Sequence, residues 1–330
     1  MKVIDVHAHV VPDGFPACPT CCKPEAWPAM ERRDGGKSAV VIGGKDFRVL
    51  DGRSWNVDRR MTDMDIEDVT MQALSPMPEL LSYWLEPAAA LEMARHVNRA
   101  ISEMVAAAPQ RFVGLGMVPL QDPQMAAKEL ASFRDDYNLV GVEIGSNIGG
   151  RSPGDPFFDP FFAEAERLGL AIFVHALHPA GVDRLVGPAK RLTAFVNFPL
   201  DTGLAAASMI TGRTLEKFPK LRIGFSHGGG TLASFLPRLA SGWERMSELN
   251  SAFGSPKEAA RRFYYDNIVF DPGLLRHLIN TFGATQVFAG SDYPFVAGQS
   301  YPGQCFEQLG LTPAELELVG SGNARRFLGI

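Results

Sequence analysis

The sequence VIDVHAH, at residues 3–9, combines a short apolar run with an acid and two histidines. Valine and isoleucine are β-branched and favour extended backbone, so we predict a strand over Lys2–Val6 that leads directly into the histidines. Side chains two residues apart on a strand face the same side. His7 and His9 can therefore point at one position.

Seven more short apolar runs follow along the chain, and most of them are continuously apolar. Such runs are typical of parallel strands that are buried on both faces. The predicted strands are Lys2–Val6, Thr70–Ser75, Arg111–Val118, Val140–Gly145, Leu170–His175, Leu221–Ser226, Phe263–Asn267 and Gln286–Ala289.

Amphipathic segments, with apolar residues three and four apart, lie between these runs and predict helices. They are Ala88–Ala107, Pro123–Phe133, Asp159–Leu168, Leu204–Glu216, Thr231–Leu249, Pro272–Phe282 and Pro313–Phe327. Alternation of strands and helices predicts the α/β class, and eight repeats predict a (β/α)₈ TIM barrel formed as one domain over residues 1–330. An open doubly wound sheet is the alternative, but no Gly-x-Gly-x-x-Gly follows any strand.

Residues 12–56 interrupt this alternation with a stretch rich in proline, glycine and cysteine that is too long for an ordinary connection. We predict an insertion over the barrel mouth, with a hairpin formed by residues 39–42 and 47–50. Cys18, Cys21 and Cys22 include a Cys-x-x-Cys spacing, but the chain has no second pair to complete a zinc site. A loop of reduced cysteines is the favoured interpretation.

The composition excludes several classes of function. The chain has 32 basic and 37 acidic residues and a formal charge of −5, so it offers no basic surface for nucleic acid. No run approaches the roughly 18 apolar residues of a membrane span. The first residues lack the features of a signal peptide, and we expect a cytoplasmic protein.

Histidines and an acid occur where several predicted strands end, which is the edge that carries the active site of a parallel barrel. His175 ends the fifth strand, His227 follows the sixth and Asp292 follows the eighth. Three histidines and one carboxylate suit a divalent cation such as Zn²⁺, which leaves a fourth histidine free to move protons. Any one of these histidines could be an ordinary core or surface residue. That explanation is disfavoured for the group, because it would have to account for all of their strand-end positions at once.

The remaining histidines do not occupy strand ends. His96 and His277 lie in predicted helices, and we expect both at the surface. His178 lies just beyond the fifth strand, where contact with substrate and a role in loop structure are equally good interpretations.

Taken together, these residues resemble the amidohydrolase superfamily, and within it the decarboxylase branch typified by 2-amino-3-carboxymuconate 6-semialdehyde decarboxylase. The resemblance extends over most of the chain. The matching segments are residues 4–9, 71–75, 82–84, 111–116, 217–221, 226–230, 290–295 and 322–324.

The resemblance implies that His7, His9, His175 and Asp292 bind the metal. It further implies that His227 acts as the general acid/base, with Asp292 also part of the catalytic group. The implied cofactor is Zn²⁺, with Mn²⁺ or Co²⁺ as alternatives.

Arg48, in the insertion, and Arg238, in the helix after the triple glycine, match positions that hold the carboxylate of a small-molecule substrate. A guanidinium can donate two parallel hydrogen bonds to a carboxylate, which fixes the orientation of the carboxylate. In the family Arg238 reaches the site of the neighbouring subunit, which implies a homodimer. The alternative for each arginine is an ordinary solvated surface charge.

The implied reaction is non-oxidative decarboxylation of a carboxylated muconate semialdehyde or a related acid from aromatic catabolism. A hydrolase or hydratase of the same superfamily, acting on a related ring-cleavage product, is the alternative. A barrel without catalytic activity is disfavoured because all the expected site residues are present. The family usually has a Pro-Trp pair after the third metal histidine, whereas this chain has Ala176, Leu177 and His178. The resemblance therefore does not identify the substrate.

Overall fold

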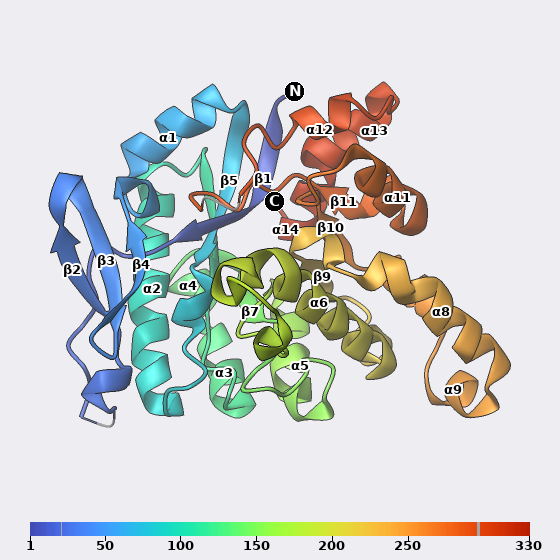
Figure 1. Ribbon diagram of the computed structural model, residues 1–330, viewed down its shortest axis with the longest axis horizontal. Coiled ribbons are helices and arrows are strands. Elements are labelled where there is room, and N and C mark those ends of the chain that lie inside the picture. The colour runs from blue at the N-terminus through green and yellow to red at the C-terminus, as the bar shows by residue number, and fades with distance from the viewer. Residues whose placement is uncertain (21, 296–297) are drawn as a thin grey trace.

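The computed structural model describes residues 1–20, 22–295 and 298–330, and its centre is an eight-stranded parallel sheet (Figure 1). The strands follow one another around the sheet in the order in which they occur along the chain. They are β1 (Val3–Val10), β5 (Val69–Pro76), β6 (Phe112–Gly116), β7 (Leu139–Gly145), β8 (Ala171–His175), β9 (Arg222–Phe225), β10 (Tyr264–Asp266) and β11 (Val287–Phe288).

The sheet closes on itself between its first and last strands. Parallel bridges join Asp5 to Ala289 and Ala8 to Tyr293, and the Val6 amide donates to the Ala289 carbonyl at 3.0 Å. The predicted (β/α)₈ barrel is therefore confirmed. β1 runs further than predicted, because the strand continues through the two histidines to Val10.

Helices fill the connections and surround the barrel. They are α1 (Val57–Ile66), α2 (Pro87–Ala107), α3 (Pro123–Leu130), α4 (Ser132–Asp135), α5 (Asp159–Leu168), α6 (Ala189–Thr211), α7 (Thr214–Lys217), α8 (Leu232–Arg245), α9 (Ser247–Ala252), α10 (Pro256–Ala260), α11 (Pro272–Phe282), α12 (Gln304–Glu307), α13 (Pro313–Glu317) and α14 (Asn323–Leu328). Among the helices of the described residues, none is long and apolar enough to cross a membrane.

The helix α6 begins well before the predicted start at Leu204. Pro199 lies inside it, and a proline within an apolar stretch normally indicates a helix boundary. The carbonyl of Pro199 accepts a hydrogen bond from the Thr231 amide at 3.0 Å, which joins the helix to the residue before α8. The early part of α6 borders the active-site cavity described below.

The insertion after β1 forms a separate antiparallel sheet of β2 (Ala29–Arg33), β3 (Lys37–Ile42) and β4 (Lys45–Leu50), which stands beside α2 at the left of Figure 1. The predicted hairpin is confirmed as β3 and β4, with positive φ at Gly43 and Gly44 in its turn. The strand β2 was not predicted, because its sequence is mostly charged and polar.

His96 contributes to the attachment of the insertion rather than lying free on the surface as predicted. Its Nε2 is 2.8 Å from the carbonyl oxygen of Gly14, and its side chain is half-buried on α2. His277 is exposed on α11, as predicted. Of the three clustered cysteines, Cys21 lies outside the described residues.

A change of register within β1 turns the two histidines into the barrel. Pairing with β5 shifts between Asp5 and Ala8. Before the shift Ile4 and Val6 pack with residues of four other strands and of α14 in the cluster at the centre of the barrel. After it, His7 and His9 point inward, with their ring centroids 4.9 Å apart. Bulges commonly redirect side chains next to active sites, and this one has that effect.

The carboxylate of Asp5 ties the closing strands together. Its Oδ1 accepts from the amides of His7 at 3.1 Å and Ser291 at 3.0 Å. Its Oδ2 accepts from the Ser291 hydroxyl at 2.6 Å and the Gln72 amide at 2.8 Å. Arg60, which is fully buried, donates in turn to Gln72 at 2.7 Å. One side chain thus joins β1, β5 and the segment after β11.

We predict that Asp5→Asn destabilises the fold by about 2–4 kcal/mol, because an amide group would face hydrogen-bond donors in a buried position. Urea unfolding measures the change in free energy. The control is Asp65→Asn, which breaks an exposed ion pair with Arg111 and should change stability by only about 0–1 kcal/mol. Equal effects of the two substitutions would contradict the role given to Asp5.

Candidate metal centre and active-site cavity

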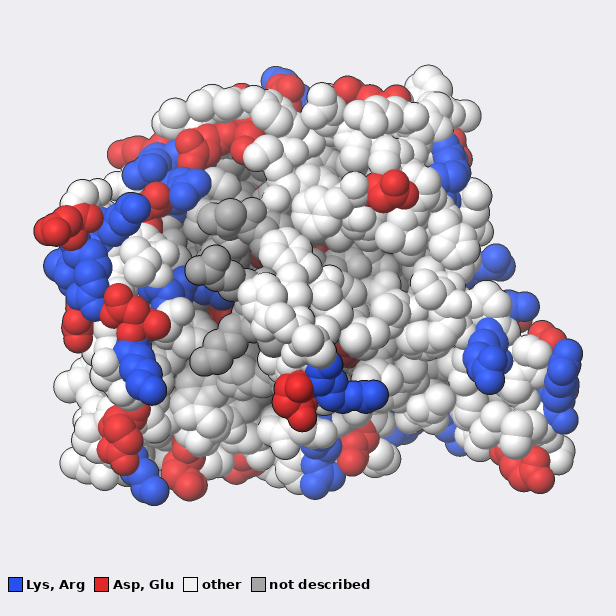
Figure 2. Space-filling view, in the orientation of Figure 1, with Lys and Arg blue, Asp and Glu red and all other residues white. Residues whose placement is uncertain are grey.

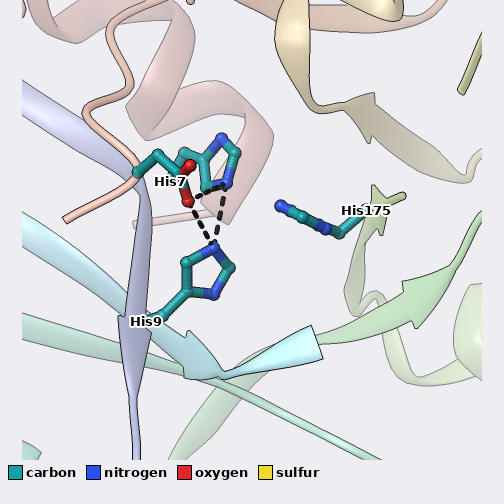
Figure 3. A group of neighbouring side chains, drawn as sticks. His7, His9 and His175 are labelled. Atoms are coloured by element: carbon teal, nitrogen blue, oxygen red, sulfur yellow. Dashed lines mark hydrogen bonds and ion pairs between the residues drawn. The ribbon is translucent and has the colours of Figure 1, made fainter. Parts of the chain in front are cut away.

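Four residues that are distant in sequence meet at the carboxyl ends of the barrel strands. His7, His9, His175 and Asp292 are all buried, and one ligand atom from each lies within 4.8 Å of the others. Figure 3 shows the rings of His7 and His9 on β1 and His175 on β8 turned toward a common point. The Nε2 atoms of His7 and His9 are 3.0 Å apart, and Asp292 Oδ1 is 3.0 Å from His9 Nε2.

The other ring nitrogen of each histidine contacts a hydrogen-bond acceptor. His7 Nδ1 is 2.6 Å from Asp266 Oδ2, His9 Nδ1 is 2.8 Å from the Pro76 carbonyl oxygen, and His175 Nδ1 is 2.8 Å from the Ala176 carbonyl oxygen. Each Nδ1 must carry the proton to donate to its acceptor, so each Nε2 keeps its lone pair.

This arrangement fits a bound divalent cation. The Nε2 atoms of His7 and His9 are 3.0 Å apart, and their lone pairs repel each other. A cation bound by both nitrogens and by the Asp292 carboxylate would remove this repulsion. His175 Nε2 is buried with no hydrogen-bond partner among the described residues. Burial also holds the pKa of His175 well below its usual 6.5, which keeps the ring neutral for metal binding. Imidazole nitrogens with one carboxylate are a donor set for first-row divalent metals.

Asp266, at the end of β10, orients the metal centre and was not predicted. Besides contacting His7, its carboxylate accepts from the backbone amides of His227 at 2.9 Å and Gly228 at 2.8 Å. It therefore fixes one metal ligand and the loop after β9 together. The sequence contains a signal for this role, because Asp266 lies near the carboxyl end of the predicted strand Phe263–Asn267, the edge at which the histidines also lie.

Glu143 is a second acid that the sequence analysis missed. It lies on β7 inside the barrel, with Oε2 at 3.7 Å from His9 Nδ1, and is fully buried. Burial raises the pKa of Glu143 to about 7. The signal in the sequence was one charged residue within the otherwise apolar run Val140–Gly145.

His227 lies beside the metal ligands without being one of the four. Its ring centroid is 5.1 Å from that of His175 and 5.4 Å from that of His7. Its Nδ1 is buried and has no hydrogen-bond partner among the described residues. Burial lowers the pKa of His227 below its usual 6.5, so the ring is neutral at pH 7 and can accept a proton.

A cavity of about 220 Å³ opens onto His175, Asp292 and His227. Most of its wall is apolar: the lining includes Phe195, Phe198, Ile268, Val269, Phe270, Leu274 and Phe295. Of the described residues that line it, Arg48 and Glu79 are the only charged ones apart from the metal centre and His227. The cavity therefore suits a small, largely apolar anion.

Arg48, which was predicted to bind substrate, does line this cavity. It extends from β4 of the insertion, donates from Nη2 to Glu79 Oε1 at 2.9 Å, and places its Cζ 4.4 Å from the ring centre of Phe295. The insertion thus supplies part of the active-site wall.

Arg238 and His178 lie elsewhere. Arg238 is exposed on α8, which projects with α9 at the right of Figure 1, and it is absent from the lining of this cavity. His178 is exposed beside a different cavity, with its ring 5.4 Å from that of Trp84. Their contacts with substrate stay predictions.

Comparisons with known proteins agree with this geometry. The family model described as amidohydrolase matches residues 4–330. The 2-amino-3-carboxymuconate-6-semialdehyde decarboxylase of Dictyostelium discoideum is 34% identical over 330 residues, which cover 99% of this chain and 91% of that protein. The chain therefore belongs to the amidohydrolase family.

Solved structures of decarboxylases share the fold over most of the chain. The 5-carboxyvanillate decarboxylase of Sphingomonas paucimobilis has a TM-score of 0.84 and 26% identity, covering 100% of this chain and 99% of the other. A dihydroxybenzoic acid decarboxylase of Polaromonas sp. JS666, solved with manganese and the inhibitor 2-nitroresorcinol, has a TM-score of 0.73 and 22% identity, covering 85% of this chain and 88% of the other. With its buried metal centre, the chain is a metal-dependent decarboxylase of the amidohydrolase family.

We predict that Asp266→Asn weakens metal affinity about 10- to 100-fold, because the amide orients His7 less firmly than the carboxylate does. Competition with a chelator measures the affinity. Asp271→Asn is the control, since Asp271 caps α11 and asparagine caps helices equally well. Unchanged metal affinity in Asp266→Asn would remove Asp266 from the metal centre.

Proposed function

We propose that this decarboxylase removes the carboxyl group of a carboxylated muconate semialdehyde or a related acid of aromatic catabolism. The observation that carries the proposal is a buried His₃Asp centre with a free histidine beside it, facing an apolar cavity that contains one arginine. The named decarboxylases to which the chain is similar act on acids of this kind. No redox cofactor is required, because the reaction replaces CO₂ by one proton on carbon.

Zn²⁺ is the metal that we propose for the centre formed by His7, His9, His175 and Asp292, with Mn²⁺ or Co²⁺ as alternatives. Three imidazoles and one carboxylate favour Zn²⁺ among the common divalent cations. The bound cation would supply Lewis acidity to an oxygen atom in the cavity.

His227 is proposed to move the proton that the reaction requires. Delivery of a proton to the carbon that carries the carboxylate creates an electron sink in the conjugated substrate. The electron pair of the bond to the carboxyl carbon then flows into the substrate as CO₂ leaves. A ring that lines the cavity and is neutral at pH 7 is suited to accept and return this proton.

Arg48 is proposed to orient a carboxylate of the substrate, while the phenylalanines exclude water. A low-polarity wall strengthens the interaction between a guanidinium and an anion. We further propose that Arg238 completes the site of a neighbouring subunit in a homodimer. Its exposed position on the projecting α8 supports this arrangement.

We expect His227→Ala to reduce CO₂ release at least about 100-fold, the typical contribution of a general acid/base, while metal content per chain is unchanged. The assay incubates metal-loaded protein with carboxylated muconate semialdehydes and hydroxybenzoates and measures CO₂, with elemental analysis for the metal. His277→Ala, at an exposed histidine, is the control and should keep full activity.

Two other results would overturn these assignments. Loss of metal in His227→Ala would make His227 a ligand. Two organic fragments, or addition of water, in place of CO₂ from the wild-type protein would identify a hydrolase or hydratase.

Complementation tests the shared site. Chains with His227→Ala and chains with Arg238→Ala should each be inactive alone. In a mixed dimer, one site has both an intact His227 and the partner's intact Arg238, so random mixing should restore about one quarter of wild-type activity. No recovery in confirmed mixed dimers would show that Arg238 does not act across subunits.

A further inference from the structure

The ion pair of Arg48 and Glu79 is close to the metal centre. The Phe295 ring lies 5.2 Å from the ring of His9 in a stacked arrangement, and Arg48 Cζ lies 4.4 Å from the centre of the same Phe295 ring. One aromatic ring thus contacts both a metal ligand and the ion pair. The ion pair and two of the metal ligands, His175 and Asp292, also line the same cavity.

Each partner of this ion pair retains one unused polar atom. Arg48 Nη2 and Glu79 Oε1 bond to each other, but Arg48 Nε and Glu79 Oε2 are buried with no hydrogen-bond partner among the described residues. Glu79 is 8% exposed and also lines the cavity. Buried polar atoms are normally paired, because an unpaired one loses its hydration without compensation. A free donor and a free acceptor therefore occur together in the cavity wall.

We propose that Glu79 determines substrate specificity by accepting a hydrogen bond from a hydroxyl or amino group of the substrate. Arg48 Nε donates to an acceptor on the same molecule. This inference rests on the proposed function, and it narrows the substrate to hydroxy- or amino-substituted conjugated acids.

The charge of Glu79 disfavours the simpler alternatives. An acid with no donor leaves Glu79 Oε2 unpaired, and a second carboxylate placed against it meets a like charge. Sites built to bond a donor discriminate strongly against analogues that lack one, because the polar group of the protein is then left buried and unsatisfied. The adjacent apolar wall offers no other described charged side chain to compensate.

The test compares binding of 2-, 3- and 4-hydroxybenzoate with binding of their methyl ethers, which keep the oxygen but lack the donor. Calorimetry on Zn²⁺-loaded protein gives Kd for each probe. We expect at least one hydroxybenzoate to bind about 10-fold or more tightly than its methyl ether.

Glu79→Gln should reduce that ratio to about one, since its one acceptor oxygen bonds to Arg48 and its amide presents donors instead. The matched control is Glu129→Gln, which removes the charge of another buried glutamate paired with an arginine, Arg95, and should leave the ratio unchanged. Thermal unfolding of each variant checks that it is folded.

Three results would overturn the role of Glu79. The wild type could bind every hydroxybenzoate and its methyl ether with equal Kd. The preference for the hydroxybenzoate could be unchanged in Glu79→Gln, or no probe could bind at all. CO₂ measured in the same samples separates this inference from the proposed function. No CO₂ from any acid, with the Glu79-dependent ratio intact, would overturn the decarboxylation and leave the recognition of a donor standing.

Discussion

Three imidazole lone pairs and one carboxylate are directed at a single buried position, and the rest of the active site depends on this arrangement. The proton on each Nδ1 is fixed by an acceptor: Asp266 for His7, and carbonyl oxygens for His9 and His175. Without these acceptors the rings could rotate or change tautomer, and the lone pairs would no longer converge. The same acid, Asp266, holds the loop that carries His227. One set of hydrogen bonds thus positions the metal ligands and His227, the residue proposed to move the proton.

The barrel provides this precision by closing at the place where the ligands lie. The residues that follow the short strand β11 pair with β1 through isolated bridges, and Asp5 adds two hydrogen bonds to Ser291 at the same seam. The register shift within β1 lets Asp5 join this seam while His7 and His9 face the interior. Closure of the fold and assembly of the metal centre are therefore physically coupled.

The cavity combines this metal centre with an apolar wall that carries one ion pair. The insertion brings Arg48 over Phe295, and Glu79 fixes Arg48. Charged side chains on the face shown in Figure 2 lie mostly toward its edges, among them the insertion, α1 and the region of α8 and α9, whereas much of its middle is uncharged. The apolar surroundings make the few charges in the cavity more effective, because little water competes with them.

The sequence by itself determined the barrel and the group of residues at its site. Continuous apolar runs alternate with amphipathic segments, and the carboxyl ends of parallel strands meet at one edge, so His7, His9, His175, His227 and Asp292 could be grouped from their positions alone. The resemblance to the family implied which of these histidines bind the metal. The hairpin of the insertion was also readable from its glycine turn. The early start of α6 was not, because Pro199 lies inside that helix and a proline normally indicates a helix boundary. The partners of Asp266, Asp5 and Glu79 were decided by tertiary structure, because a hydrogen bond depends on distances of a few ångströms between segments that are far apart in the chain.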